Sequence, residues 1–134
     1  MKFQHTLTAA ALFALSTSAA QAEWLGFCGM YQQVWSNAGA CPACSLIVAD
    51  NPELQFYFVE ANNGWTAELN WVEGDESVAT GEGQWGDVGG AYGNQRFDID
   101  LYRDRAILTM DMTMHDSSVA GTIQAQYVCS DGSM

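Results

Sequence analysis

Three methionines alternate with polar residues and end beside a histidine in one short stretch, Met110-Asp111-Met112-Thr113-Met114-His115. If this stretch is a β-strand, its side chains point alternately to two faces, so the three thioethers share one face and His115 lies at the strand end. Soft thioether sulfur together with imidazole suits Cu(I). The stretch therefore predicts a Cu(I) site made of four side chains, namely Met110, Met112, Met114 and His115.

The same stretch resembles the Met-x-Met strands of periplasmic copper chaperones over six residues. The resemblance implies a periplasmic Cu(I)-binding protein. The competing interpretation is a packed interior, because the methionines continue an apolar series that starts at Leu108 and flexible methionines fill irregular gaps in cores. We take the packed core as the first interpretation, with no cofactor, and Cu(I) binding as the alternative.

Four cysteines stand at positions 28, 41, 44 and 129. In an exported chain, four cysteines most simply form two disulfides, for which three pairings exist. If the first and last strands of a barrel are neighbours, Cys28 pairs with Cys129 and Cys41 with Cys44. The Cys41-Pro42-Ala43-Cys44 spacing is also that of a thiol oxidoreductase, whose attacking cysteine begins a helix. The β-branched residues after Cys44 disfavour that helix, so redox chemistry is our third hypothesis.

The carboxylates form no recognisable catalytic arrangement. Acid–base catalysis needs two carboxylates of separated pKa in a cleft, or a nucleophile paired with a base. After residue 22 the chain has a single histidine and no Gly-x-Ser-x-Gly motif, so we expect no enzymatic activity. Glu82, between two glycines, is the carboxylate to inspect, with a structural role expected. If Leu101 faces Leu108 across a hairpin, Asp98 faces Asp111 on the outer side, where a cation would relieve their repulsion.

Acidic residues dominate the charge of the chain. Its 134 residues include 4 Lys and Arg against 16 Asp and Glu, for a formal net charge of -12. Nucleic acid and anionic membrane surfaces are disfavoured as partners, because both require clustered basic residues. An acidic surface suits salty surroundings or the capture of a basic protein, for example a lysozyme.

The first 22 residues have the order of a secretory signal peptide. Basic residues at positions 2 and 5 precede an apolar run from Leu7 to Leu15, and Ala20-Gln21-Ala22 follows as a cleavage site. We expect a signal peptide over 1–22, a single domain over 23–134, and a periplasmic or secreted location. The apolar run is shorter than the ~20 residues that span a bilayer, so no membrane span is expected.

Alternation of apolar and polar residues runs through most of the remaining chain, as in Trp65 to Trp71 and Arg96 to Leu101. Such alternation is typical of half-buried strands, and turn residues such as Asn62-Asn63-Gly64 separate the runs. About eight short strands follow, which favours an all-β fold, a small antiparallel up-and-down barrel. An open β-sandwich is the alternative. One short helix is possible in Met30–Trp35 or Cys41–Ala49.

Aromatic residues fall on the apolar side of the expected strands, and near an open barrel end they would hold an apolar ligand. The ligand-binding residues predicted in this way are Tyr31, Trp65, Trp71, Trp85 and Tyr127, and Trp35 and Phe97 share their side. Plain core packing is the alternative role. We expect a monomeric, exported, non-catalytic protein that binds a small apolar molecule inside the barrel or a basic protein at its acidic surface.

Overall fold

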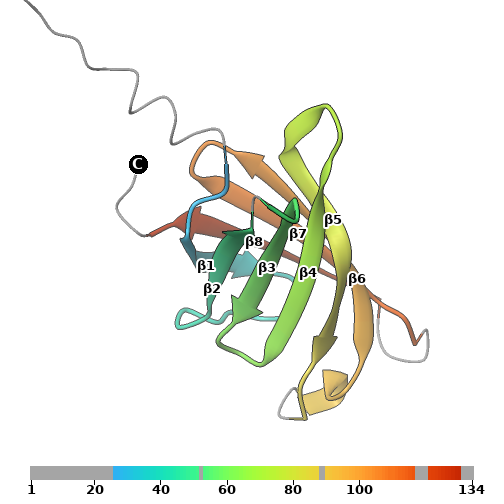
Figure 1. Ribbon diagram of the computed structural model, residues 1–134. Coiled ribbons are helices and arrows are strands. Elements are labelled where there is room, and N and C mark those ends of the chain that lie inside the picture. The colour runs from blue at the N-terminus through green and yellow to red at the C-terminus, as the bar shows by residue number, and fades with distance from the viewer. Residues whose placement is uncertain (1–25, 52, 88–89, 117–120, 131–134) are drawn as a thin grey trace, which may run out of the picture.

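Eight antiparallel strands follow one another around a closed barrel in a computed structural model of the chain (Figure 1). The structure describes residues 26–51, 53–87, 90–116 and 121–130, so the predicted signal peptide over 1–22 lies outside the described residues. The strands are β1 (Met30–Ser36), β2 (Ser45–Asn51), β3 (Phe56–Ala61), β4 (Trp65–Val72), β5 (Asp75–Trp85), β6 (Arg96–Asp104), β7 (Ile107–Met114) and β8 (Thr122–Cys129). A short 3-10 helix, η1 (Gly90–Tyr92), lies between β5 and β6.

The two-residue alternation of the sequence explains the strands. In β4, Trp65, Ala67 and Leu69 are buried while the residues between them are exposed. In β7, the side chains from Leu108 to Met114 at every second position are buried in the same way. These inward residues join one apolar core, so the predicted all-β barrel is confirmed.

Pairing of β1 with β8 closes the barrel. Tyr31 faces Cys129 and Gln33 faces Tyr127, so the first and last strands are bonded like any other neighbours. Closure leaves no free sheet edge among these eight strands, which an open sandwich would have kept. The region considered for a short helix forms β1 and β2 instead. Among the described residues, no helix has the length and apolar character that crossing a membrane requires.

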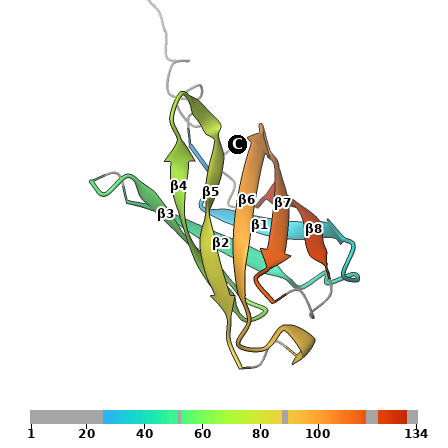
Figure 2. The same cartoon turned by 90° about the vertical axis from the view of Figure 1, so that its right-hand side faces the viewer.

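The strands alternate in direction, so the connections gather at two ends of the barrel. We call one the Cys28 end: it holds the disulfide between Cys28 and Cys129 and the β2–β3, β4–β5 and β6–β7 turns. We call the other the Trp85 end: it holds the β1–β2 connection, the β3–β4 turn and η1. In Figure 1 the β4–β5 turn is at the top and η1 at the bottom. Figure 2 shows β5 and β6 running side by side between these two ends.

Turn geometry sets the register of the hairpins and corrects one prediction. The β6–β7 turn is centred on Arg105 and Ala106, and Arg105 has a positive φ of 58°. Asp104 therefore faces Ile107, and Leu101 faces Met110 rather than Leu108. The predicted pairing of Asp98 with Asp111 is wrong by two residues: Asp98 faces Thr113, and Asp100 faces Asp111.

Register shifts lie next to two aromatic residues, and one of them turns its ring away from the interior. The register of β1 against β8 shifts between Gln33 and Trp35, and Trp35 is 49% exposed. The register of β4 against β5 shifts between Trp71 and Val72, and Trp71 is 38% exposed. A bulge adds one residue to a strand and thereby reverses which face the following side chains occupy. Strict alternation therefore fails at Trp35. Trp71 precedes its register shift, so it keeps the inward side, faces the buried Ala79 and packs on Tyr57, and it is partly exposed because it lies near the end of β4.

Glycines in the middle of β5 allow its neighbours to approach closely. A side chain at Gly81 would collide with the backbone of Glu68, and one at Gly83 would collide with Thr66 and with the ring of Phe97. Glycine within a strand commonly marks such a close approach or a sharp bend. These two positions let Phe97 pack inward while Glu82, between them, is presented to solvent.

Candidate functional site

A pocket of about 290 Å³ opens at the Trp85 end of the barrel. Its wall combines rings and thioethers from the inward face of several strands, and its rim comes from the β1–β2 connection. The lining residues include Trp65, Trp85, Tyr92, Met110, Met112, Ile123, Ala125 and Tyr127, with Gln33, Ser36, Asn63 and Cys41. A concave pocket that combines apolar side chains with polar groups is a common form of a small-molecule site.

Trp85 combines burial with an unpaired donor. Its side chain is 6% exposed and stacks on Tyr92, with ring centroids 5.5 Å apart and an interplanar angle of 24°. The indole Nε1 is buried and has no hydrogen-bond partner among the residues that the structure describes. A buried donor that lacks an acceptor carries a desolvation cost of roughly 1–3 kcal/mol. An acceptor on a bound molecule could remove that cost.

Trp65 and Tyr127 are held in place by their neighbours. Trp65 meets Phe97 edge-on, with ring centroids 5.7 Å apart. The Tyr127 hydroxyl lies 4.0 Å from Met110 Sδ, to which it donates a weak hydrogen bond. Burial of the Tyr127 phenol raises its pKa well above the usual value, so it remains a neutral donor at physiological pH.

The other two predicted ligand-binding residues lie away from this pocket. The buried Tyr31 accepts a hydrogen bond of 2.9 Å from the backbone N–H of Cys28, at the Cys28 end. Trp71 is at the same end and packs on Tyr57, with ring centroids 5.7 Å apart. Trp71 borders a wide depression of about 910 Å³ with exposed Leu54 and the acidic β4–β5 turn. Three of the five residues thus share one site, and two belong to the opposite end.

The predicted metal residues are divided between the two faces of β7. Met110, Met112 and Met114 are buried on the inner face, and the first two line the pocket. His115 follows directly after Met114 and lies on the outer surface. Alternation separates the imidazole from the thioethers, because adjacent residues of an extended chain point to opposite faces.

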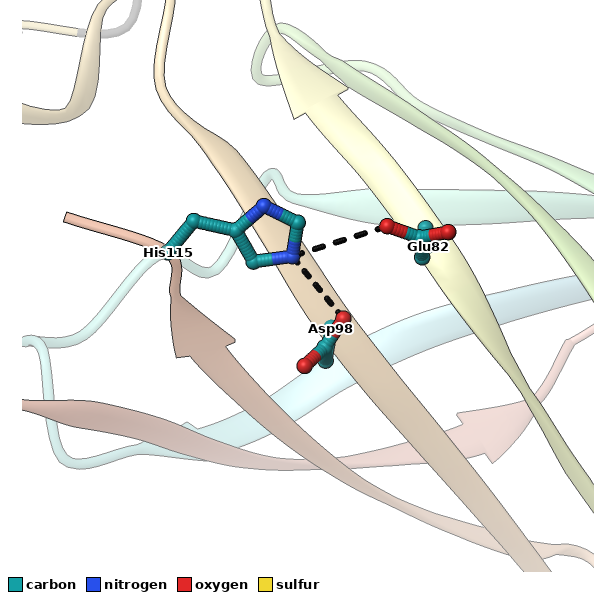
Figure 3. A group of neighbouring side chains, drawn as sticks. All are labelled: Glu82, Asp98 and His115. Atoms are coloured by element: carbon teal, nitrogen blue, oxygen red, sulfur yellow. Dashed lines mark hydrogen bonds and ion pairs between the residues drawn. The ribbon is translucent and has the colours of Figure 1, made fainter.

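On the outer surface, His115 meets two carboxylates that the sequence alone did not connect to it. His115 Nε2 lies 2.9 Å from Asp98 Oδ1 and 3.6 Å from Glu82 Oε1. Figure 3 shows both carboxylates directed at the same ring nitrogen, Glu82 from β5 and Asp98 from β6. Potential ligand atoms of these three exposed residues all lie within 4.8 Å of one another. The sequence offered one signal for this grouping: all three residues fall on the outward-facing side of the alternating pattern.

More acidic residues cover the same outer surface. Glu68 faces Glu82 across β4 and β5, and Asp100 faces Asp111 across β6 and β7. Partial burial, followed by repulsion from Asp111 and Asp98, raises the pKa of Asp100. Asp111 accepts a hydrogen bond of 3.2 Å from the Gln124 amide. This surface attracts cations and basic groups.

The Cys41–Cys44 disulfide forms part of the rim. The two cysteines are bonded to each other, and β2 begins at the next residue, Ser45. The Asn62 side chain fixes this segment by accepting from Ser45 N at 2.9 Å and donating to Ala43 O at 2.8 Å. A strand follows Cys44 where an oxidoreductase places a helix, so the feature that lowers the pKa of an attacking cysteine is missing here. The disulfide braces the pocket entrance.

Comparison of the chain with models of protein families, with curated proteins and with solved structures finds no match.

Proposed function

We propose that this protein is an exported, non-catalytic binding protein that holds a small, largely apolar molecule in the pocket at the Trp85 end. The observation that carries the proposal is a hollow of about 290 Å³ lined by rings and thioethers of the barrel core. Apolar pockets gain affinity from the surface that a ligand removes from water. The two disulfides support a location in an oxidising compartment, periplasmic or secreted.

The lining also favours a particular kind of ligand. Trp65, Trp85 and Tyr92 offer flat surfaces on which an aromatic ring can stack or meet an edge. The unpaired Trp85 Nε1 favours a ligand with one hydrogen-bond acceptor. A compact aromatic molecule with a single carbonyl, ether or ring nitrogen fits both requirements.

A fluorescence titration tests this proposal. The neutral probe 1-aminoanthracene should bind with one site per chain, and compact aromatic ketones should displace it. The Trp85→Phe variant keeps a ring but removes the donor, so it should bind the ketones about threefold to tenfold more weakly. Trp71→Phe is the matched control at the Cys28 end and should bind like the wild type.

Two results would count against the small-molecule function. One is absence of probe binding by a folded wild-type protein. The other is an equal loss of affinity in Trp85→Phe and Trp71→Phe, because that pattern would show that the probe does not use the pocket.

Cu(I) binding by the thioethers is the second candidate, favoured by the position of Met110 and Met112 in the pocket wall. Met114 is buried on the same face of β7, so three soft ligands follow one strand. Competition with a Cu(I) chelator should show weaker binding by Met112→Leu than by the wild type, since leucine keeps the volume and removes the sulfur. Equal affinity would eliminate this candidate.

Capture of a basic protein is the other form of the binding hypothesis. A shallow groove of about 460 Å³ on the outer surface is lined by Glu68, Glu82 and the exposed Phe58. Arg96 also lines this groove, so its two carboxylates face one basic side chain. Acidic groups around an apolar ring suit a partner rich in lysine and arginine. Calorimetry with a lysozyme at low salt should show binding that weakens as salt increases. Absence of heat at low salt would exclude this partner.

A further inference from the structure

We propose that Glu82, Asp98 and His115 form a binding site for a divalent transition-metal ion, with Zn²⁺ as the representative ion, on the outer face of the barrel. The site is separate from the pocket at the Trp85 end, because His115 lies on the face of the sheet opposite to the buried Met114. The metal site can therefore be tested independently of the small-molecule function.

The spacing of the ligand atoms matches a coordination sphere. Zinc binds histidine nitrogen and carboxylate oxygen at about 2.0–2.2 Å, so two of its ligands lie about 3.0 Å apart at a right angle and about 3.4 Å apart at the tetrahedral angle. The observed separations from His115 Nε2 are 2.9 Å to Asp98 Oδ1 and 3.6 Å to Glu82 Oε1. These two separations fit a bound metal ion with shifts of a few tenths of an ångström, and the two carboxylate oxygens lie within 4.8 Å of each other.

The backbone holds all three residues in this arrangement. Glu82 and Asp98 are direct cross-strand partners of β5 and β6. The backbone N–H of His115 donates to Arg96 O at 2.8 Å, which extends the β6–β7 ladder one step beyond Met114. Side chains on paired strands lose less freedom on binding a metal than side chains on loops.

The charges at this position call for a cation. Glu82 and Asp98 are like charges directly opposite each other, and Glu68 faces Glu82 from the other side. Such pairs are destabilising unless an opposite charge lies between them. A divalent ion supplies two positive charges and binds both carboxylates.

The ligand types select the class of metal. One imidazole nitrogen and two carboxylate oxygens suit Zn²⁺ and neighbouring first-row ions, with Cu²⁺ tighter and Mn²⁺ weaker. Cu(I) prefers the sulfur ligands on the inner face. Three protein ligands leave coordination positions open for water or for a group from another molecule.

Isothermal titration of untagged protein with zinc chloride tests the site. The wild type should bind one Zn²⁺ per chain, and zinc should raise its melting temperature. Asp98→Asn and His115→Gln should each weaken binding about tenfold or more. All three ligands are exposed, so these variants should fold like the wild type.

Asp111→Asn is the matched control. It removes one negative charge from the same outer surface without removing a proposed ligand, and it should keep zinc affinity within about threefold of the wild type. Equal weakening in Asp98→Asn and Asp111→Asn would reduce the effect to diffuse electrostatic attraction and overturn the proposal. Unchanged affinity in His115→Gln, or no binding and no thermal shift at ~100 μM zinc, would overturn it as well.

Discussion

The two ends of the barrel both carry clustered aromatic residues, but they use them differently. At the Cys28 end, Phe27 meets Tyr57 with ring centroids 4.9 Å apart, and Tyr57 packs on Trp71, so the rings contact each other beside the Cys28–Cys129 disulfide. At the Trp85 end, Trp65, Trp85 and Tyr92 line a hollow. The comparison teaches that aromatic content does not identify a binding end; what matters is whether other side chains already occupy the space between the rings.

The largest expected effect concerns the disulfides. Replacing Cys28 and Cys129 by serine should lower the free energy of unfolding by about 4–5 kcal/mol, because that bond closes a loop of about 100 residues. Replacing Cys41 and Cys44 should cost about 2 kcal/mol, because only three positions separate them. Guanidinium denaturation of both double variants measures the difference. Equal losses of unfolding free energy would mean that the two disulfides stabilise the fold to the same extent, so the ends would not differ in this way.

Two buried alanines test whether the ends differ in free space. Ala125 lines the pocket, whereas Ala79 lies next to Trp71 in the packed region. Ala79→Leu should destabilise the fold by about 1–3 kcal/mol through overpacking. Ala125→Leu should cost less than about 1 kcal/mol and should reduce probe binding, because leucine occupies the hollow.

Thermal denaturation and the 1-aminoanthracene titration check this pair of variants. A larger loss of stability for Ala125→Leu than for Ala79→Leu would mean that the pocket end is the better packed one. If Ala125→Leu bound the probe as well as the wild type does, the probe would not bind in the pocket at the Trp85 end.

A smaller effect is expected at alkaline pH. Burial, followed by repulsion from Asp50, raises the pKa of Tyr57 from 10.0 to about 12. Because the folded value exceeds the unfolded value, the contribution is fully present below pH 10 and is lost as pH rises through about 12. Tyr57→Phe should therefore lose less stability than the wild type over this interval.

Absorbance at the phenolate band and denaturation at several pH values check the alkaline prediction. Tyr127→Phe provides the comparison at the pocket, where burial raises the tyrosine pKa further. If Tyr57→Phe and the wild type lost stability in parallel, ionisation of Tyr57 would not be the cause of the alkaline loss of stability.

The sequence was sufficient for the barrel because alternation is a local property. Each run such as Trp65 to Trp71 specifies which side chains face inward, and the turn at Gly64, with φ of 113°, separates β3 from β4 as expected. The sequence was insufficient wherever one residue changes the parity or the register. The bulge before Trp35 turned one ring outward, and the turn at Arg105 moved Asp98 opposite Thr113.

The pocket and the outer-surface site also differ in how far the sequence alone predicts them. Inward parity predicts that Trp65, Trp85 and Tyr127 face the interior of a small barrel, where they line the pocket, but it makes the same prediction for Tyr31, which lies at the opposite end. The grouping of Glu82, Asp98 and His115 depends on the register of three strands, and these residues are 33 positions apart from first to last. Parity indicates that they share the outer face, but only the pairing pattern shows that they meet.

The pairing of cysteines has a consequence for the order in which the chain matures. During synthesis Cys28, Cys41 and Cys44 emerge long before Cys129, so an early thiol could react with the wrong neighbour. Rapid oxidation of Cys41 with Cys44 would consume both nearby competitors, because the ring they close is the smallest available. Cys28 can pair with Cys129 only after the whole barrel sequence has been made, and that bond then fastens β1 to β8 where the barrel closes.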